Sequence, residues 1–71
     1  MLIRAIYRKA RSPEDSLIVK IAEGLDKRLD EIGHTRDSAD YPTLMKYARA
    51  VAKELNGTVQ LDKHELIFRF D

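Results

Sequence analysis

The sequence predicts an α+β domain in which two helices pack on one face of a three-stranded sheet. Two central segments, residues 12–33 and 42–57, carry apolar residues at the three- and four-residue spacing of amphipathic helices. The two ends of the chain instead carry short runs of β-branched and aromatic residues, which are typical of strands. The order is therefore β-α-α-β-β, and placing both helices on one sheet face is the simplest way to bury their apolar stripes.

The size of the chain limits what can stabilise it. Its 71 residues are enough for a single small globular domain, residues 1–71. A domain of this size buries only about 60% of the surface that its unfolded chain exposes, so disulfides, metals or association commonly reinforce such domains. The sequence has no cysteine, and its two histidines, His34 and His64, lie far apart. We therefore expect no disulfide and no metal, and we expect a homodimer.

The first strand is expected at residues 2–7, Leu-Ile-Arg-Ala-Ile-Tyr. Alternate side chains of a strand point to opposite faces of its sheet. Both rows of this segment contain apolar residues, so the local sequence leaves open which row faces the helices. We expect the helices to cover the row that contains Ile3, Ala5 and Tyr7.

The first helix has clear signals at both of its ends. Ser12 is a suitable N-cap, and Pro13 suits the first helical position because no hydrogen-bond partner is needed for its nitrogen. Gly33 lies where a left-handed residue commonly ends a helix. Between them, the apolar residues at helical spacing are Leu17, Ile18, Ile21, Ala22, Leu25, Leu29 and Ile32.

Gly24 interrupts the apolar spacing of this first helix. A glycine inside a helix costs about 1 kcal/mol relative to alanine. Close packing against the second helix is a physical reason for a glycine here, and Ala48 and Ala52 are the expected neighbours.

The second helix is expected to begin near Pro42 and to end at Asn56-Gly57, which is a strong stop signal. Its N-cap is either Asp40 or Thr43, since both side chains can accept a hydrogen bond from an unpaired backbone N–H group. The expected buried stripe consists of Leu44, Ala48, Val51, Ala52 and Leu55.

The last segment, residues 58–70, alternates between apolar and polar residues and predicts a hairpin with residues 62–65 in its turn. One long bent strand is the alternative. In the hairpin, one face presents Val59, Leu61, Leu66, Phe68 and Phe70, and we expect that face to meet the helices.

The opposite, outer face of the sheet is the candidate functional surface. Its composition of arginines beside aliphatic residues is typical of protein interfaces. The alternative interpretation is an ordinary solvated face, on which the arginine stems cover the isoleucines. The candidate residues for binding a protein partner are Arg4, Ile6, Arg8, Ile67 and Arg69.

Nucleic-acid binding is the alternative function. A formal net charge of +1 argues against strong non-specific binding, which usually needs a basic domain. Phosphates would instead contact the basic sheet face, or a stripe of cations on one side of the second helix. That stripe consists of Lys46, Arg49 and Lys53.

The loop between the helices, residues 34–42, contains a histidine, a serine and two aspartates. Catalytic triads draw their members from separate elements, so we expect these side chains to form local turns and caps. No apolar run approaches the roughly 20 residues that span a bilayer. The sequence thus predicts a cytoplasmic, non-catalytic binding or regulatory module, without a cofactor and without membrane association.

Overall fold

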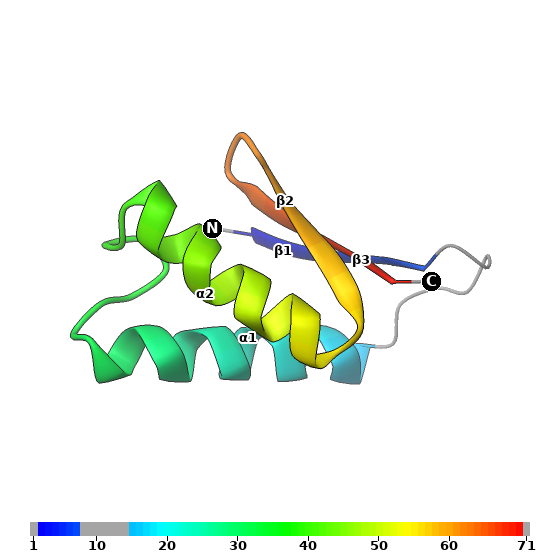
Figure 1. Cartoon of the computed structure of the whole chain (residues 1–71), viewed down its shortest axis with the longest axis horizontal. Coiled ribbons are helices and arrows are strands. Elements are labelled where there is room, and N and C mark those ends of the chain that lie inside the picture. The colour runs from blue at the N-terminus through cyan, green and yellow to red at the C-terminus, as the bar shows by residue number, and fades with distance from the viewer. Residues whose placement is uncertain (1, 8–14, 71) are drawn as a thin grey trace.

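The computed structural model describes residues 2–7 and 15–70. Its elements are β1 (Leu2–Tyr7), α1 (Asp15–Glu31), α2 (Tyr41–Glu54), β2 (Gly57–Asp62) and β3 (Glu65–Phe70). Both helices lie on the same side of the three-stranded sheet (Figure 1). The predicted α+β class and the β-α-α-β-β order are therefore confirmed.

The last strand of the chain, β3, lies in the centre of the sheet, in the order β1-β3-β2. It pairs with β1 in parallel and with β2 in antiparallel orientation. Residues 58–70 are thus a hairpin and not one bent strand. Its turn is shorter than predicted, because Asp62 and Glu65 pair with each other as strand residues and leave only Lys63 and His64 between them. Lys63 adopts a left-handed backbone conformation with a φ of 55°.

The strand register decides which row of β1 faces the helices. Ile3 lies beside Leu66, and Leu66 lies beside Leu61 on its other side. Leu66 is completely buried, and Ile3 and Leu61 pack against the core as partly buried residues. The expected inner row of β1, the one with Ile3, is therefore the observed one.

The core lies between this inner face and the two helices. Ile32, which the apolar spacing assigned to the buried stripe of α1, is instead 43% exposed. The helix ends at Glu31, so Ile32 already belongs to the turn that leaves it. The largest fully buried side chains come from α1, α2 and β3, and they are Ile21, Leu25, Leu29, Leu44, Leu66 and Phe68.

Gly33 ends α1 as the sequence predicted, with a φ of 77°. The N–H group of His34 donates to the carbonyl of Leu29, and that of Gly33 donates to the carbonyl of Asp30, both at 2.9 Å. These two bonds form the Schellman motif, which satisfies carbonyls at the end of a helix. The proposed cap at the other end, Ser12 with Pro13, lies outside the described residues.

Asp40, and not Thr43, is the N-cap of α2. Its Oδ1 atom accepts a hydrogen bond of 2.9 Å from the backbone N–H group of Thr43. Hydrogen bonds from the side chain and the backbone of Thr43 favour the charged carboxylate and lower the pKa of Asp40, and the nearby His34 adds to this effect. At the other end, Asn56 follows the C-cap in a left-handed conformation with a φ of 59°.

Two glycines differ in how much room surrounds them. A Cβ atom on Gly57 would lie 2.6 Å from two ring carbons of Phe70 and 2.7 Å from the carbonyl oxygen of Arg69. A Cβ atom on Gly24 would lie 3.8 Å from Val51, at ordinary contact distance. On the second helix, the atoms nearest to this position belong to Val51, where Ala48 and Ala52 were the expected neighbours.

Candidate functional site

The candidate site is the outer face of the sheet, on the side away from the helices. The register places Arg4 of β1 and Gln60 of β2 on either side of Ile67, at the centre of β3. Alternation along the three strands assigns nine positions to this outer face. They are Leu2, Arg4, Ile6, Thr58, Gln60, Asp62, Glu65, Ile67 and Arg69.

Ile67 is only 6% exposed, although neither helix lies on its side of the sheet. Its neighbours on the outer face are Arg4 and Gln60 across the strands, and Glu65 and Arg69 along β3. Long polar side chains of this kind cover apolar surface with their stems while their heads stay in water. The register therefore positions side chains of the same face to cover Ile67.

Hydrogen bonds across the strands hold both arginines of this cover. Arg4 Nη1 lies 3.3 Å from Glu65 Oε2, in an ion pair between β1 and β3. Arg69 donates through Nη1 to Oε1 of Gln60, between β3 and β2. The side chain of Arg4 is still 59% exposed, so its pair with Glu65 is a surface pair that contributes little to stability.

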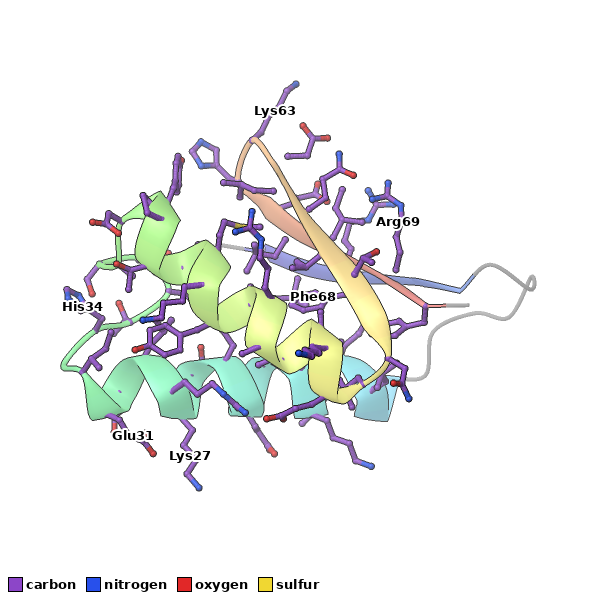
Figure 2. The ribbon with its side chains drawn as sticks, in the orientation of Figure 1. Lys27, Glu31, His34, Lys63, Phe68 and Arg69 are labelled. Atoms are coloured by element: carbon purple, nitrogen blue, oxygen red, sulfur yellow. The ribbon has the colours of Figure 1, made fainter. Side chains whose placement is uncertain are left out.

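Charge on the outer face is unevenly distributed along the strands. Asp62 and Glu65 lie side by side at the hairpin turn, whereas Arg69 lies four residues further along β3. Four residues of a strand span roughly 13 Å. Figure 2 shows Lys63 at the tip of the hairpin and Arg69 well below it. One end of the face is therefore acidic and the other basic, with Arg4 between them.

The structure brings three of the five predicted partner-binding residues together, namely Arg4, Ile67 and Arg69. Ile6 belongs to the same face by register, beside Arg69, and Arg8 lies outside the described residues. The acids of the face were missed, because Asp62 and Glu65 were assigned to a four-residue turn. Counting back in steps of two from Arg69 through Ile67 would have placed Glu65 on this face.

The cationic stripe of α2 forms a second, separate surface. Lys46, Arg49 and Lys53 are all exposed, and within residues 2–7 and 15–70 none of them makes an ion pair. The Lys46 ammonium lies 5.7 Å from the centre of the Tyr47 ring. The one acid of α2, Glu54, pairs with Arg28 of α1. Since α2 covers the inner face of the sheet, this stripe does not adjoin the outer face.

The loop between the helices uses its polar side chains locally. Ser38 Oγ accepts a bond of 2.8 Å from the N–H group of Thr35, and Thr35 Oγ1 accepts one of 3.1 Å from the N–H group of Ser38. This reciprocal pair resembles a capping box. His34 Nδ1 lies 3.2 Å from the same Ser38 oxygen. The expected turns and caps are therefore present in this loop.

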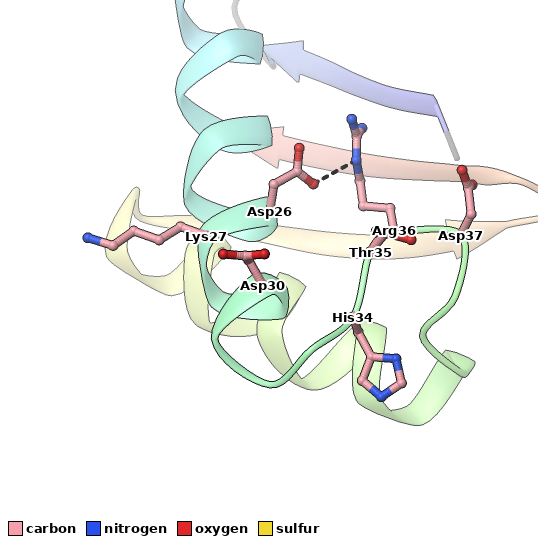
Figure 3. Close-up of a pocket in the computed structure, with 7 residues that line it drawn as sticks. All are labelled: Asp26, Lys27, Asp30, His34, Thr35, Arg36 and Asp37. Atoms are coloured by element: carbon pink, nitrogen blue, oxygen red, sulfur yellow. Dashed lines mark ion pairs between the residues drawn. The ribbon is translucent and has the colours of Figure 1, made fainter.

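An open hollow lies between this loop and α1 (Figure 3). Across it, Arg36 Nε pairs with Asp26 Oδ1 at 2.8 Å and ties the loop to the helix. The described residues contain no group of three histidine, cysteine or acidic side chains that could hold a metal ion. The hollow is lined by Asp26, Lys27, Asp30, His34, Thr35, Arg36 and Asp37.

The comparisons with known proteins leave the site to be interpreted from its own chemistry. No family model, no curated protein and no solved structure matches this chain. Among the described residues, neither helix has the length and apolar character that crossing a membrane requires.

Proposed function

We propose that this chain is a small non-catalytic protein-binding module that acts through the outer face of its sheet. The observation that carries the proposal is Ile67, which is 6% exposed on a face that neither of the described helices covers. An aliphatic residue beside two arginines, here Arg4 and Arg69, has the composition of an interface anchor with its polar surround.

Binding through this face requires the cover over Ile67 to move. Arg4 is held by a surface ion pair, a type of contact that contributes only about 0–1 kcal/mol. A partner that brings an apolar side chain onto Ile67 would displace the arginine stems at little cost. The two guanidinium heads would then be available to carboxylates or carbonyls of that partner, which is how arginine commonly contributes at interfaces.

A capture experiment with paired baits tests this function. The wild-type chain is compared with the double variant Arg4→Glu/Arg69→Glu, and the proteins retained from source lysate are quantified by mass spectrometry. The matched control is Arg49→Glu/Lys53→Glu, which makes the same change in charge on the exposed side of α2. We expect the outer-face variant to lose a partner that the wild type and the α2 variant both retain.

Circular dichroism must first show that all three baits are folded. A partner retained equally by the wild type and by both variants would mean that the outer face is not the binding surface. The proposal includes a second copy of this chain as partner as well as a different protein, and in either case the module acts by masking or bridging what it binds.

Nucleic-acid binding through α2 is the second candidate, and it is favoured by the cations of the stripe, which make no ion pair within residues 2–7 and 15–70. Three phosphate contacts, from Lys46, Arg49 and Lys53, would give a slope of roughly −2.7 in a plot of log affinity against log salt on duplex DNA. Fluorescence anisotropy at low salt, with duplex and single-stranded probes, measures this slope. We expect weak binding that Lys46→Glu/Arg49→Glu/Lys53→Glu abolishes, and an absence of binding at low salt would exclude this candidate.

A further inference from the structure

The four neighbours of Ile67 on the outer face have a distribution of charge that is complementary to itself. We propose that two copies of this chain pack outer face to outer face around a two-fold axis that passes over Ile67, with their strands crossing at nearly a right angle. This inference rests on the proposed function, because it names the occupant of the same face.

Four outer-face neighbours surround Ile67. Arg4 lies on its β1 side and Gln60 on its β2 side, while Glu65 precedes it by two residues and Arg69 follows it by two. Going around Ile67, the two arginines are therefore adjacent, and so are the two acceptors, Gln60 and Glu65. A diagonal across the strands therefore separates the four neighbours into a pair of cations and a pair of hydrogen-bond acceptors.

Most two-fold axes over Ile67 would bring like charges together. An axis parallel to the strands places Arg69 opposite Arg69 of the second copy, and an axis perpendicular to them places Arg4 opposite Arg4. One of the two diagonal axes places Arg4 opposite Arg69. Like charges facing each other in an interface cost several kcal/mol, so these three arrangements are unfavourable.

The remaining diagonal axis satisfies every charged neighbour. It places Arg4 opposite Glu65 of the second copy, and Arg69 opposite Gln60 of the second copy. These are the pairs that each chain already forms internally. Each arginine can therefore exchange its own acceptor for an identical one across the interface, and the Ile67 side chains meet at the axis. A diagonal axis makes the strands cross at about 90°, which is one of the two common ways for sheets to pack.

The area of the face limits the strength of this contact. Strands lie about 4.8 Å apart and outward-facing residues about 6.6 Å apart along each strand, so the nine positions cover a patch of roughly 15 by 20 Å. That is less than the roughly 800 Å² per partner of a standard interface. We therefore expect a weak dimer that dissociates on dilution.

Sedimentation equilibrium over a wide concentration range tests the inference with reversed charges. Arg4→Glu places two acids opposite each other, and Glu65→Arg places two cations opposite each other, so each variant alone should dimerise about tenfold more weakly or worse. Mixing the two variants restores both opposite-charge contacts, so an equimolar mixture should dimerise like the wild type. This recovery requires position 4 of one chain to face position 65 of the other.

Two controls keep the result interpretable. Lys27→Glu changes the charge on α1, away from the sheet, and should leave the dimer unchanged (Figure 2). Arg4→Glu/Glu65→Arg in one chain keeps the internal ion pair with its ends exchanged, so it protects the fold and should dimerise by itself. Circular dichroism of every variant verifies that it is folded.

Three outcomes would overturn the inference: a monomer at all concentrations, a dimer that neither single variant weakens, or a mixture that does not recover. The proposed function fails separately. A monomeric chain that still loses a captured protein through Arg4→Glu/Arg69→Glu would exclude the second copy as occupant and retain the binding face.

Discussion

The two faces of the sheet bury their central residues by different means. On the inner face, Phe68 is completely buried on the side of the two helices, whereas on the outer face its neighbour Ile67 is 6% exposed among long polar residues of the same face. The two exposures are similar, but the covers are not equally firm. Removing the inner cover requires the helices to leave the core, whereas removing the outer cover requires only that exposed side chains change rotamer. Low exposure alone therefore does not distinguish a core residue from a concealed binding residue.

Truncation of a core side chain on the inner face should lower the stability of the fold more than any other change considered. Phe68→Ala removes the ring at the centre of the core, and the helices cannot close the resulting cavity without leaving their mutual contact. The expected loss is about 3–5 kcal/mol. The core of so small a domain supplies about as much net stability, so most of the chain should be unfolded at room temperature. Circular dichroism melting measures this, and a cooperative transition close to that of the wild type would contradict it.

Gly57→Ala should be the next most damaging change. The added methyl group would overlap the Phe70 ring and the Arg69 carbonyl oxygen, and that oxygen belongs to the backbone of the central strand. Overpacking of this kind costs typically 1–3 kcal/mol, and we expect the upper end because backbone cannot rotate away. Urea unfolding provides the measurement. A midpoint equal to that of the wild type would show that β2 can shift away from Phe70.

Ile67→Ala should cost less than either inner-face change, at about 2 kcal/mol, the lower end for truncating a buried isoleucine. The stems of Arg4 and Arg69 are flexible and can settle into the space that the side chain vacates. Urea unfolding of Ile67→Ala beside Phe68→Ala measures the difference directly. Equal losses would mean that the two covers are equally rigid, and the proposed opening of the outer face would lose its support.

Gly24→Ala should change the stability of the fold least, and it should raise that stability instead of lowering it. The new methyl group would have ordinary contact with Val51 and with the end of the Arg28 side chain. Alanine should stabilise α1, and with it the folded domain, by roughly 0.5–1 kcal/mol, because glycine is the poorer helix former. A higher melting temperature without any change in outer-face binding would confirm that the two faces are independent. A lower one would mean that α1 and α2 pack more tightly than the structure indicates.

Most of the fold could be predicted from local sequence signals. The Gly33 end of α1, the stripe of α2 and the existence of the hairpin all depend on residues close together in the chain. The inner row of β1 does not follow from local sequence, because both of its rows contain apolar residues. What decides it is the parallel pairing of Ile3 with Leu66, which joins segments distant in the sequence.

The charge on the candidate site was the harder part to predict. Two-residue hairpin loops prefer Asn-Gly or Asp-Gly, because those residues adopt positive φ easily. Here Lys63 adopts it instead, so the sequence suggested a longer turn. That error removed Asp62 and Glu65 from the strands and left an outer face that looked wholly basic. A turn predicted two residues too long thus made the outer face look basic alone, whereas the structure gives it an acidic end and a basic end.

The pairing of β1 with β3 also sets the time at which this sheet can be completed on the ribosome. Leu2 has its sheet partner at Glu65, and β1 has no other neighbouring strand in the described sheet. At about 5–20 residues per second, the intervening chain takes roughly 3–13 seconds to synthesise. Throughout that interval β1 has an apolar row and two unpaired edges, while the helices can form and meet. This strand is therefore the segment of the nascent chain that most needs protection from other chains.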